Sequence, residues 1–159
     1  MRNILIVGAA AAAIATTALA QQSPQETAVK ARQAHMTLYS ANLGVLGAMA
    51  QGNMDYDAER AQMAAGNLAA LAQLHQGLYW LPGTSHEEIE SSRTLPALWE
   101  NGEEARAYGM ALAEAAVAME AVAGDGVEAL QANLGAIGRN CGGCHEDFRL
   151  SVQAHLFHM

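Results

Sequence analysis

Two cysteines and a histidine stand together near the end of the chain, in the run Cys141-Gly142-Gly143-Cys144-His145. The C-x-x-C-H pattern is typical of covalent attachment of c-type haem. Each thiol can form a thioether with the porphyrin, and the imidazole that follows can bind the iron as its proximal ligand. Because helix positions separated by three and four residues share one face, all three groups would point at the same flat cofactor.

A cysteine pair with this spacing has other chemical uses. Cys141 and Cys144 are the only cysteines in the 159 residues, so no second pair can complete a four-thiolate zinc site. A thioredoxin-like motif lies at the start of a helix that follows a strand, whereas this pair lies inside a long helical pattern near the C-terminus. A structural disulfide or a redox pair stays open as the alternative to haem c.

The first twenty residues have the features of an export signal. Arg2 precedes an apolar, alanine-rich run over residues 4–15, and Ala18-Leu19-Ala20 fits a cleavage site. This run is shorter than the ~20 apolar residues that a membrane-spanning helix needs. We therefore expect a signal peptide over residues 1–20 that is cleaved after Ala20, and a periplasmic protein without a membrane span.

Composition indicates one all-α domain over residues 21–159. The chain is rich in alanine and poor in β-branched residues, which favours helices over strands. Its formal net charge of −8 argues against nucleic acid or anionic lipid as a partner. The acidity suits a protein that meets redox partner proteins through complementary charge.

Apolar residues recur at alternating steps of three and four in four segments. These segments predict helices over about 26–51, 58–75, 105–122 and 127–152. Ser23 and Pro24 look like the N-cap and first position of the first helix. Because short turns join the first pair and the last pair, we expect an antiparallel up-down-up-down four-helix bundle. The long connection over residues 76–101 should close one end of it.

Antiparallel packing of the first and last helices sets Met36 level with residue 142, at the height of the C-x-x-C-H motif. A methionine thioether at this height could bind the iron opposite His145. The alternative is that Met36 only fills the core, as methionines in apolar seams usually do. The chain has eight methionines, so the residue type alone does not decide between the two.

Four stretches of the chain resemble the class II c-type cytochromes, the family of cytochrome c′ and its low-spin relatives. These stretches are residues 29–33, 43–52, 98–99 and 141–149, the last reading CGGCHEDFR. The resemblance implies a four-helix bundle that carries one covalently attached haem c. The stretch over 42–52 is most similar to the low-spin, methionine-ligated members.

The resemblance also implies roles for two residues of the first helix. Cytochrome c′ has five-coordinate, high-spin iron that binds nitric oxide or carbon monoxide, whereas the low-spin relatives ligate a methionine and transfer electrons. Met36 holds the position of the capping or ligating residue, although some five-coordinate members also carry an unbound methionine there. Arg32 is implied to lie near a haem propionate. A surface arginine with a buried stem is the alternative for Arg32.

Our main hypothesis from the sequence is a periplasmic electron carrier and not an enzyme. Its haem c is bound through Cys141 and Cys144, and its low-spin iron is held by His145 and Met36. The alternative is a five-coordinate, high-spin cytochrome c′ that binds nitric oxide or carbon monoxide.

Two further expectations concern the first two helices. A peroxidase-like activity would need a distal acid-base pair, but His35 points about 100° away from Met36 around the helix. Relatives often form homodimers through these helices, and Ala64 and Gly66 are expected to be small exposed residues that allow close approach.

Overall fold

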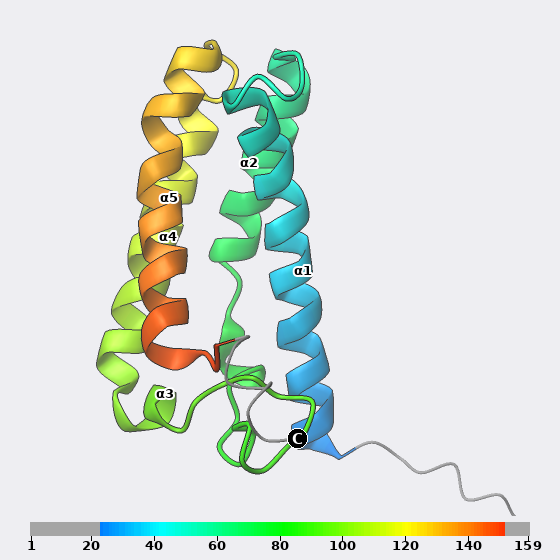
Figure 1. The fold of residues 1–159 in the computed structure, drawn as a ribbon, viewed down its shortest axis with the longest axis vertical. Helices are drawn as coiled ribbons and strands as arrows, with labels where there is room; N and C mark the ends of the chain where they lie inside the picture. The colour runs from blue at the N-terminus through cyan, green and yellow to red at the C-terminus, as the bar shows by residue number, and fades with distance from the viewer. Residues whose placement is uncertain (1–22, 152–159) are drawn as a thin grey trace, which may run out of the picture.

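The computed structural model describes residues 23–151, which form four long helices and two short ones. The elements are α1 (Pro24–Ala50), α2 (Ala58–Ala72), the 3-10 turn η1 (Gln76–Leu78), α3 (Ala97–Glu100), α4 (Gly102–Val122) and α5 (Val127–Phe148). The long helices run up and down alternately, which confirms the predicted four-helix bundle (Figure 1). The expected signal peptide lies outside the described residues, as does the tail over 152–159.

The first helix begins where the sequence predicts. Ser23 Oγ accepts a hydrogen bond from the Glu26 amide at 3.1 Å, and the Glu26 carboxylate accepts one from the Ser23 amide at 2.9 Å. This reciprocal pair satisfies two amides that the first turn leaves free. At α2, the Asp57 carboxylate caps the helix by accepting from the Arg60 amide at 2.9 Å.

At one end of the bundle, Tyr56 ties the two short turns together. Its hydroxyl donates to the Ala123 carbonyl at 2.8 Å and accepts from the Gly126 amide at 3.0 Å. Gly126 has a φ of 130°, which L side chains rarely adopt. The phenol therefore fixes the start of α5 relative to the start of α2.

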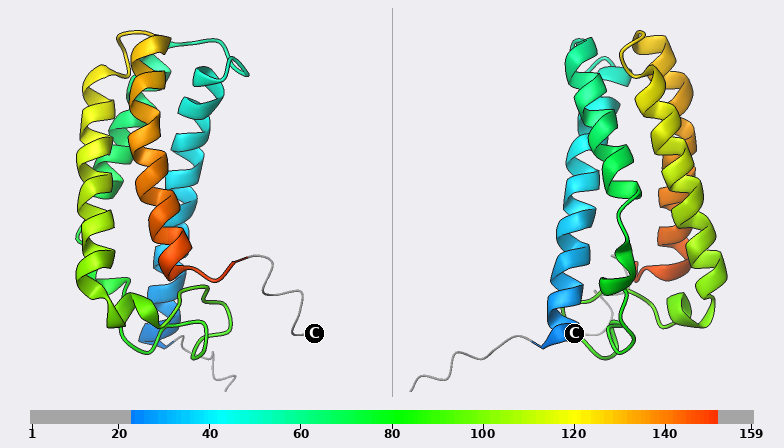
Figure 2. Two further views of the ribbon diagram at one scale, coloured as in Figure 1. Left: turned by 60° about the vertical axis from the view of Figure 1, so that its left-hand side comes forward. Right: turned by 180° about the vertical axis from the view of Figure 1, so that it is seen from behind.

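The core lies along the axis of the bundle. Each long helix contributes at least one side chain that is 2% exposed or less, and these are Leu46, Leu68, Met119 and Leu130. Burial of each such side chain stabilises the fold by about 1.5–3 kcal/mol. α1 packs against α2 and α5, and α4 packs against the same two helices (Figure 2).

The buried face of α1 differs from the predicted seam at one position. Arg32, His35 and Tyr39 are buried at consecutive turns, while Met36 is only partly buried and packs against the margin of the core. Met36 therefore lies beside the apolar core, and the neighbouring His35 is the more deeply buried residue at this turn. The alternation of steps is ambiguous between neighbouring positions, and tertiary packing selected His35.

The structure also corrects the expectation for α2. Ala64 is 4% exposed and belongs to the core cluster, so it is not a surface residue. Gly66 is partly buried, and a Cβ atom there would lie 3.2 Å from Glu120 Oε1 on α4. These small residues serve the packing of α2 against α4 within the chain.

The end of the bundle opposite Tyr56 is closed by the long connection between α2 and α4 (Figure 1). α5 ends at Phe148 instead of residue 152, because the Phe148 carbonyl accepts from the Leu95 amide at 2.9 Å. The Leu150 amide then donates to the Arg93 carbonyl at 2.8 Å. No helix within residues 23–151 combines the length and the apolar character needed to cross a membrane.

Candidate functional site

The last two turns of α5 carry the three groups that could hold a porphyrin. Cys141 and Cys144 are partly buried free thiols, and Cys141 packs against the core cluster. His145 follows on the solvent side of the same helix. Within residues 23–151, no three His, Cys, Asp or Glu side chains gather into a group that could hold a metal ion. Two thiols and one adjacent imidazole are the donor set of a covalently attached haem.

The surroundings of the two thiols and the imidazole change their pKa values. Burial raises the pKa of Cys144 to about 11, with smaller contributions from Cys141 and Asp147, and it raises the pKa of Cys141 as well. Partial desolvation of the otherwise exposed His145 ring lowers its pKa, helped by the positive charge of Arg149. A neutral imidazole is the form that ligates iron, so this environment favours the ligating form.

Tyr108 of α4 lies against the peptide between the two cysteines. A Cβ atom on Gly143 would stand only 2.6 Å from Tyr108 Cε1, so the ring occupies the space that a side chain would need. The Tyr108 hydroxyl donates to Asp147 Oδ2 at 2.8 Å, and its ring meets Phe148 edge-on at 6.3 Å. The hydrogen bond to Asp147 raises the pKa of Tyr108. Tyr108 therefore supports the outer side of the C-x-x-C-H segment.

The facing helix α1 presents three side chains at the height of the motif. Met36 packs against the same core cluster as Cys141. His35 and Tyr39 are buried and stack with ring centroids 4.7 Å apart. Burial lowers the pKa of His35. The wall opposite α5 at this level therefore contains an imidazole and a phenol as well as the expected thioether.

Arg32 is 4% exposed, which excludes the surface alternative. Its guanidinium donates to the carbonyls of Tyr79 and Thr84 and to the hydroxyls of Thr84 and Ser92, and it lies 5.1 Å from the centroid of the Trp80 ring. All four acceptors are neutral oxygens, so these contacts leave the positive charge without an anionic partner. A haem propionate would supply that partner.

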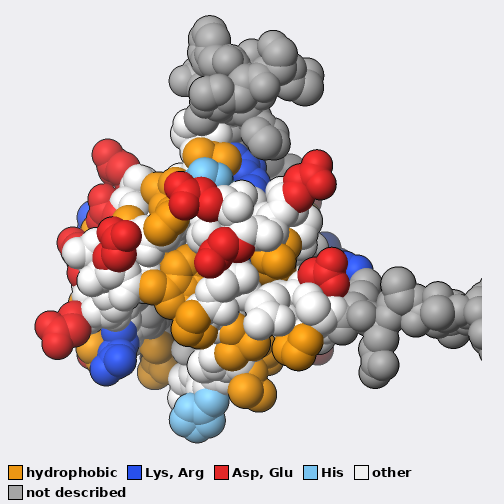
Figure 3. Space-filling model, turned by 90° about the horizontal axis from the view of Figure 1, so that it is seen from below, with side chains coloured by type: hydrophobic (Ala, Val, Ile, Leu, Met, Phe, Trp, Pro, Cys, Tyr) orange, Lys and Arg blue, Asp and Glu red, His pale blue; other side chains and the backbone are white. Residues whose placement is uncertain are grey.

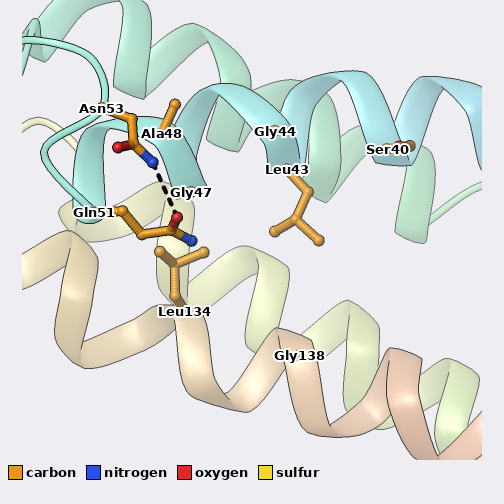
Figure 4. Close-up of a pocket in the computed structure, with 9 residues that line it drawn as sticks. All are labelled: Ser40, Leu43, Gly44, Gly47, Ala48, Gln51, Asn53, Leu134 and Gly138. Atoms are coloured by element: carbon orange, nitrogen blue, oxygen red, sulfur yellow. Dashed lines mark hydrogen bonds between the residues drawn. The ribbon is translucent and has the colours of Figure 1, made fainter.

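α1 and α5 separate beside the motif. A groove of about 580 Å³ runs between them, lined by Ser40, Leu43, Gly44, Gly47, Ala48, Gln51, Asn53, Leu134 and Gly138. Leu43 and Leu134 point into it from the two helices (Figure 4). Gly138 precedes Cys141 by one helical turn, and Ser40 follows Met36 by one turn. The groove therefore reaches within one helical turn of Cys141 and of Met36, although no residue of the C-x-x-C-H motif lines it.

The sequence analysis found the residues of α5 and missed the contributions of the other helices. It did not identify Tyr108, whose role depends on α4 lying against α5. It gave no role to Tyr39 and set His35 aside. The spacing Arg32-His35-Tyr39, with steps of three and four, was the available signal for these buried residues.

Comparisons with known proteins show the family to which the chain is related. A family model described as Cytochrome C′ matches residues 27–149. Cytochrome c′ of Cereibacter sphaeroides is 35% identical over 150 residues, covering 94% of this chain and 99% of that protein. Cytochrome c-554 of the same organism is 38% identical over 150 residues, covering 94% and 98%.

Solved structures give the same result. A cytochrome c′ from Rhodobacter superposes with a TM-score of 0.78 at 36% identity, covering 80% of this chain and 98% of that one. The nitric oxide complex of a variant of cytochrome c′ from Alcaligenes xylosoxidans superposes with a TM-score of 0.70 at 25% identity, covering 82% and 100%.

Proposed function

The chain belongs to the cytochrome c′ family of mono-haem c-type proteins, and on that premise we propose that it binds a diatomic gas, nitric oxide or carbon monoxide, at a five-coordinate iron. The observation that carries the proposal is the match of residues 27–149 to the Cytochrome C′ family model, together with a cytochrome c′ that is 35% identical. The nitric oxide complex of the relative from Alcaligenes xylosoxidans supports this choice.

In this proposal the chain holds and shields its cofactor with residues from three segments. Cys141 and Cys144 hold haem c covalently, and His145 is the proximal ligand. The guanidinium of Arg32, whose hydrogen-bond acceptors are all neutral, forms an ion pair with a haem propionate. Haem c, when bound, supplies an iron that takes up a diatomic gas and exchanges one electron. α1 packs against α5 and would limit the access of water to the bound haem.

A second function is electron transfer through low-spin iron ligated by His145 and Met36. It is favoured by one observation, namely that Met36 on α1 and Cys141 on α5 pack against the same core cluster. Viewed from the connection end, the surface shows apolar side chains with acidic ones around them (Figure 3). Such a surface suits docking to a redox partner protein of complementary charge.

The proposal includes the place of action and the assembly of the protein. Residues 1–20 would direct export and be cleaved after Ala20, so that residues 21–159 act in the periplasm as one haem-binding domain. Partners would be redox proteins or a second copy of the chain. The proposed roles are binding and electron transfer, and no catalytic activity is assigned.

Absorption spectra of the ferric and ferrous holoprotein test the choice between the two functions. For gas binding, we expect a high-spin ferrous form that takes up carbon monoxide at once. We also expect the Met36→Ala variant to have an unchanged spectrum before gas is added. A low-spin wild type that becomes high-spin on this substitution would instead establish methionine ligation.

A further inference from the structure

Two buried polar side chains of α1 have no hydrogen-bond partner among residues 23–151. They are His35, with both ring nitrogens, and Tyr39, with its hydroxyl, although the Leu71 backbone lies near the imidazole and the Gln76 side chain lies near the phenol. His35 is 5% exposed and Tyr39 is 9% exposed, so solvent does not replace the missing partners. An unpaired buried donor or acceptor costs about 1–3 kcal/mol. Such groups indicate that a partner is supplied from outside the polypeptide.

The two side chains form one structural unit. Their rings stack with an interplanar angle of 15°, and Tyr79 meets the imidazole edge-on with centroids 6.0 Å apart. These contacts hold the planes of both rings. The direction in which the phenol presents its hydroxyl is therefore set before any ligand arrives, which reduces the entropy cost of binding one.

This unit borders the haem site. Tyr39 belongs to the core cluster against which Met36 and Cys141 pack. Burial, together with the nearby Cys141, raises the pKa of Tyr39 to about 12, and the Gln76 side chain partly opposes this shift. The phenol is thus protonated at neutral pH and has a proton to donate. Tyr39 does not line the groove between α1 and α5, whose own side-chain donors are Ser40, Gln51 and Asn53.

We propose that His35 and Tyr39 form a polar wall of the haem pocket, in which the Tyr39 hydroxyl donates a hydrogen bond to a diatomic ligand on the distal side of the iron. His35 is a positioning residue that holds the plane of the phenol by stacking. The inference rests on the proposed gas-binding function. It adds a residue that slows dissociation of the ligand from the iron, because a donated hydrogen bond stabilises negative charge on the outer atom of the ligand.

The test uses the ferrous holoprotein with carbon monoxide, and compares wild type with Tyr39→Phe. Tyr39→Phe keeps the ring and removes only the hydroxyl. We expect the C–O stretching frequency to rise and carbon monoxide to dissociate about fivefold faster, the effect of losing one hydrogen bond. Tyr56→Phe is the matched control, because it removes a phenol hydroxyl at the other end of the bundle. It should leave both quantities unchanged.

The outcomes separate this inference from the function on which it rests. If wild type binds carbon monoxide and Tyr39→Phe changes neither quantity, the donor role is wrong and gas binding stands. If wild type takes up no carbon monoxide, the proposed function fails and the donor role fails with it. If uptake appears only in His35→Phe, which keeps an aromatic ring, then His35 itself ligates the iron and the inference is overturned.

Discussion

The ring of Tyr108 occupies the position where residue 143 would carry a side chain, with Cε1 only 2.6 Å from an ideal Cβ on Gly143. A residue of α4 thus dictates a glycine between the two cysteines of α5. Gly142, its neighbour, would have nothing within 4 Å of such a Cβ. There is therefore room for a side chain at position 142, whereas a side chain at position 143 would clash with Tyr108.

Gly143→Ala should destabilise the holoprotein by about 1 kcal/mol, because the added methyl displaces the Tyr108 ring and breaks its hydrogen bond to Asp147. Gly142→Ala is the matched control and should instead stabilise the helix by about 0.5–1 kcal/mol. Denaturant unfolding followed by haem absorbance measures both. In a Tyr108→Ala background, Gly143→Ala should become as harmless as Gly142→Ala; a cost that persists there would refute the steric explanation.

Arg32→Gln should lower the free energy of unfolding by about 3 kcal/mol, because four oxygen acceptors of the connection, three of them in buried hydrogen bonds, lose a charged donor. The connection over residues 79–92 should also become more accessible, since Thr84 and Ser92 are held by this guanidinium. Denaturant unfolding and limited proteolysis measure the two effects. Arg106→Gln, at an exposed position of α4, should change neither. Equal cleavage of both variants would contradict the anchoring role.

The connection between α2 and α4 should lose stability in acid, because the stabilising contact of the Glu88 carboxylate is lost when it becomes protonated. Its carboxylate accepts from the Ser85 amide at 3.0 Å, and the backbone and side chain of Ser85 hold the pKa of Glu88 below its usual 4.5. This contribution is present above pH 4.5 and is lost as the pH falls through the lower, folded pKa. The stability difference between wild type and Glu88→Gln should therefore shrink in acid. Unfolding measured from pH 7 to pH 3, with Glu90→Gln as the exposed control, tests this; a difference independent of pH would speak against it.

Tyr56→Phe should cost about 1–2 kcal/mol, since two hydrogen bonds, to the Ala123 carbonyl and from the Gly126 amide, are lost at a partly buried position. Thermal unfolding of the holoprotein would show the loss as a lower midpoint. The absorption spectrum should stay the same, because these turns lie at the end of the bundle away from the cysteines. A changed spectrum would mean that the two ends are coupled.

The sequence by itself determined the architecture and the attachment chemistry. Periodic apolar residues, the capping residues Ser23 and Pro24, and the order of Cys141, Cys144 and His145 are local features that can be read along one chain. They were sufficient for the bundle, for three of its helix starts, and for the family, because helix propensity, capping and ligand spacing act over a few residues.

Only the tertiary structure decided which of the adjacent residues His35 and Met36 is buried, and which residue of α4 packs against the C-x-x-C-H motif. His35 is buried and Met36 only partly buried, because steps of three and of four residues from Arg32 fit the same helical face and only packing selects between them. Tyr108 meets Gly143, and Arg32 meets Thr84, across 35 and 52 residues of chain. Such contacts depend on how helices pack in three dimensions, and no local pattern records them.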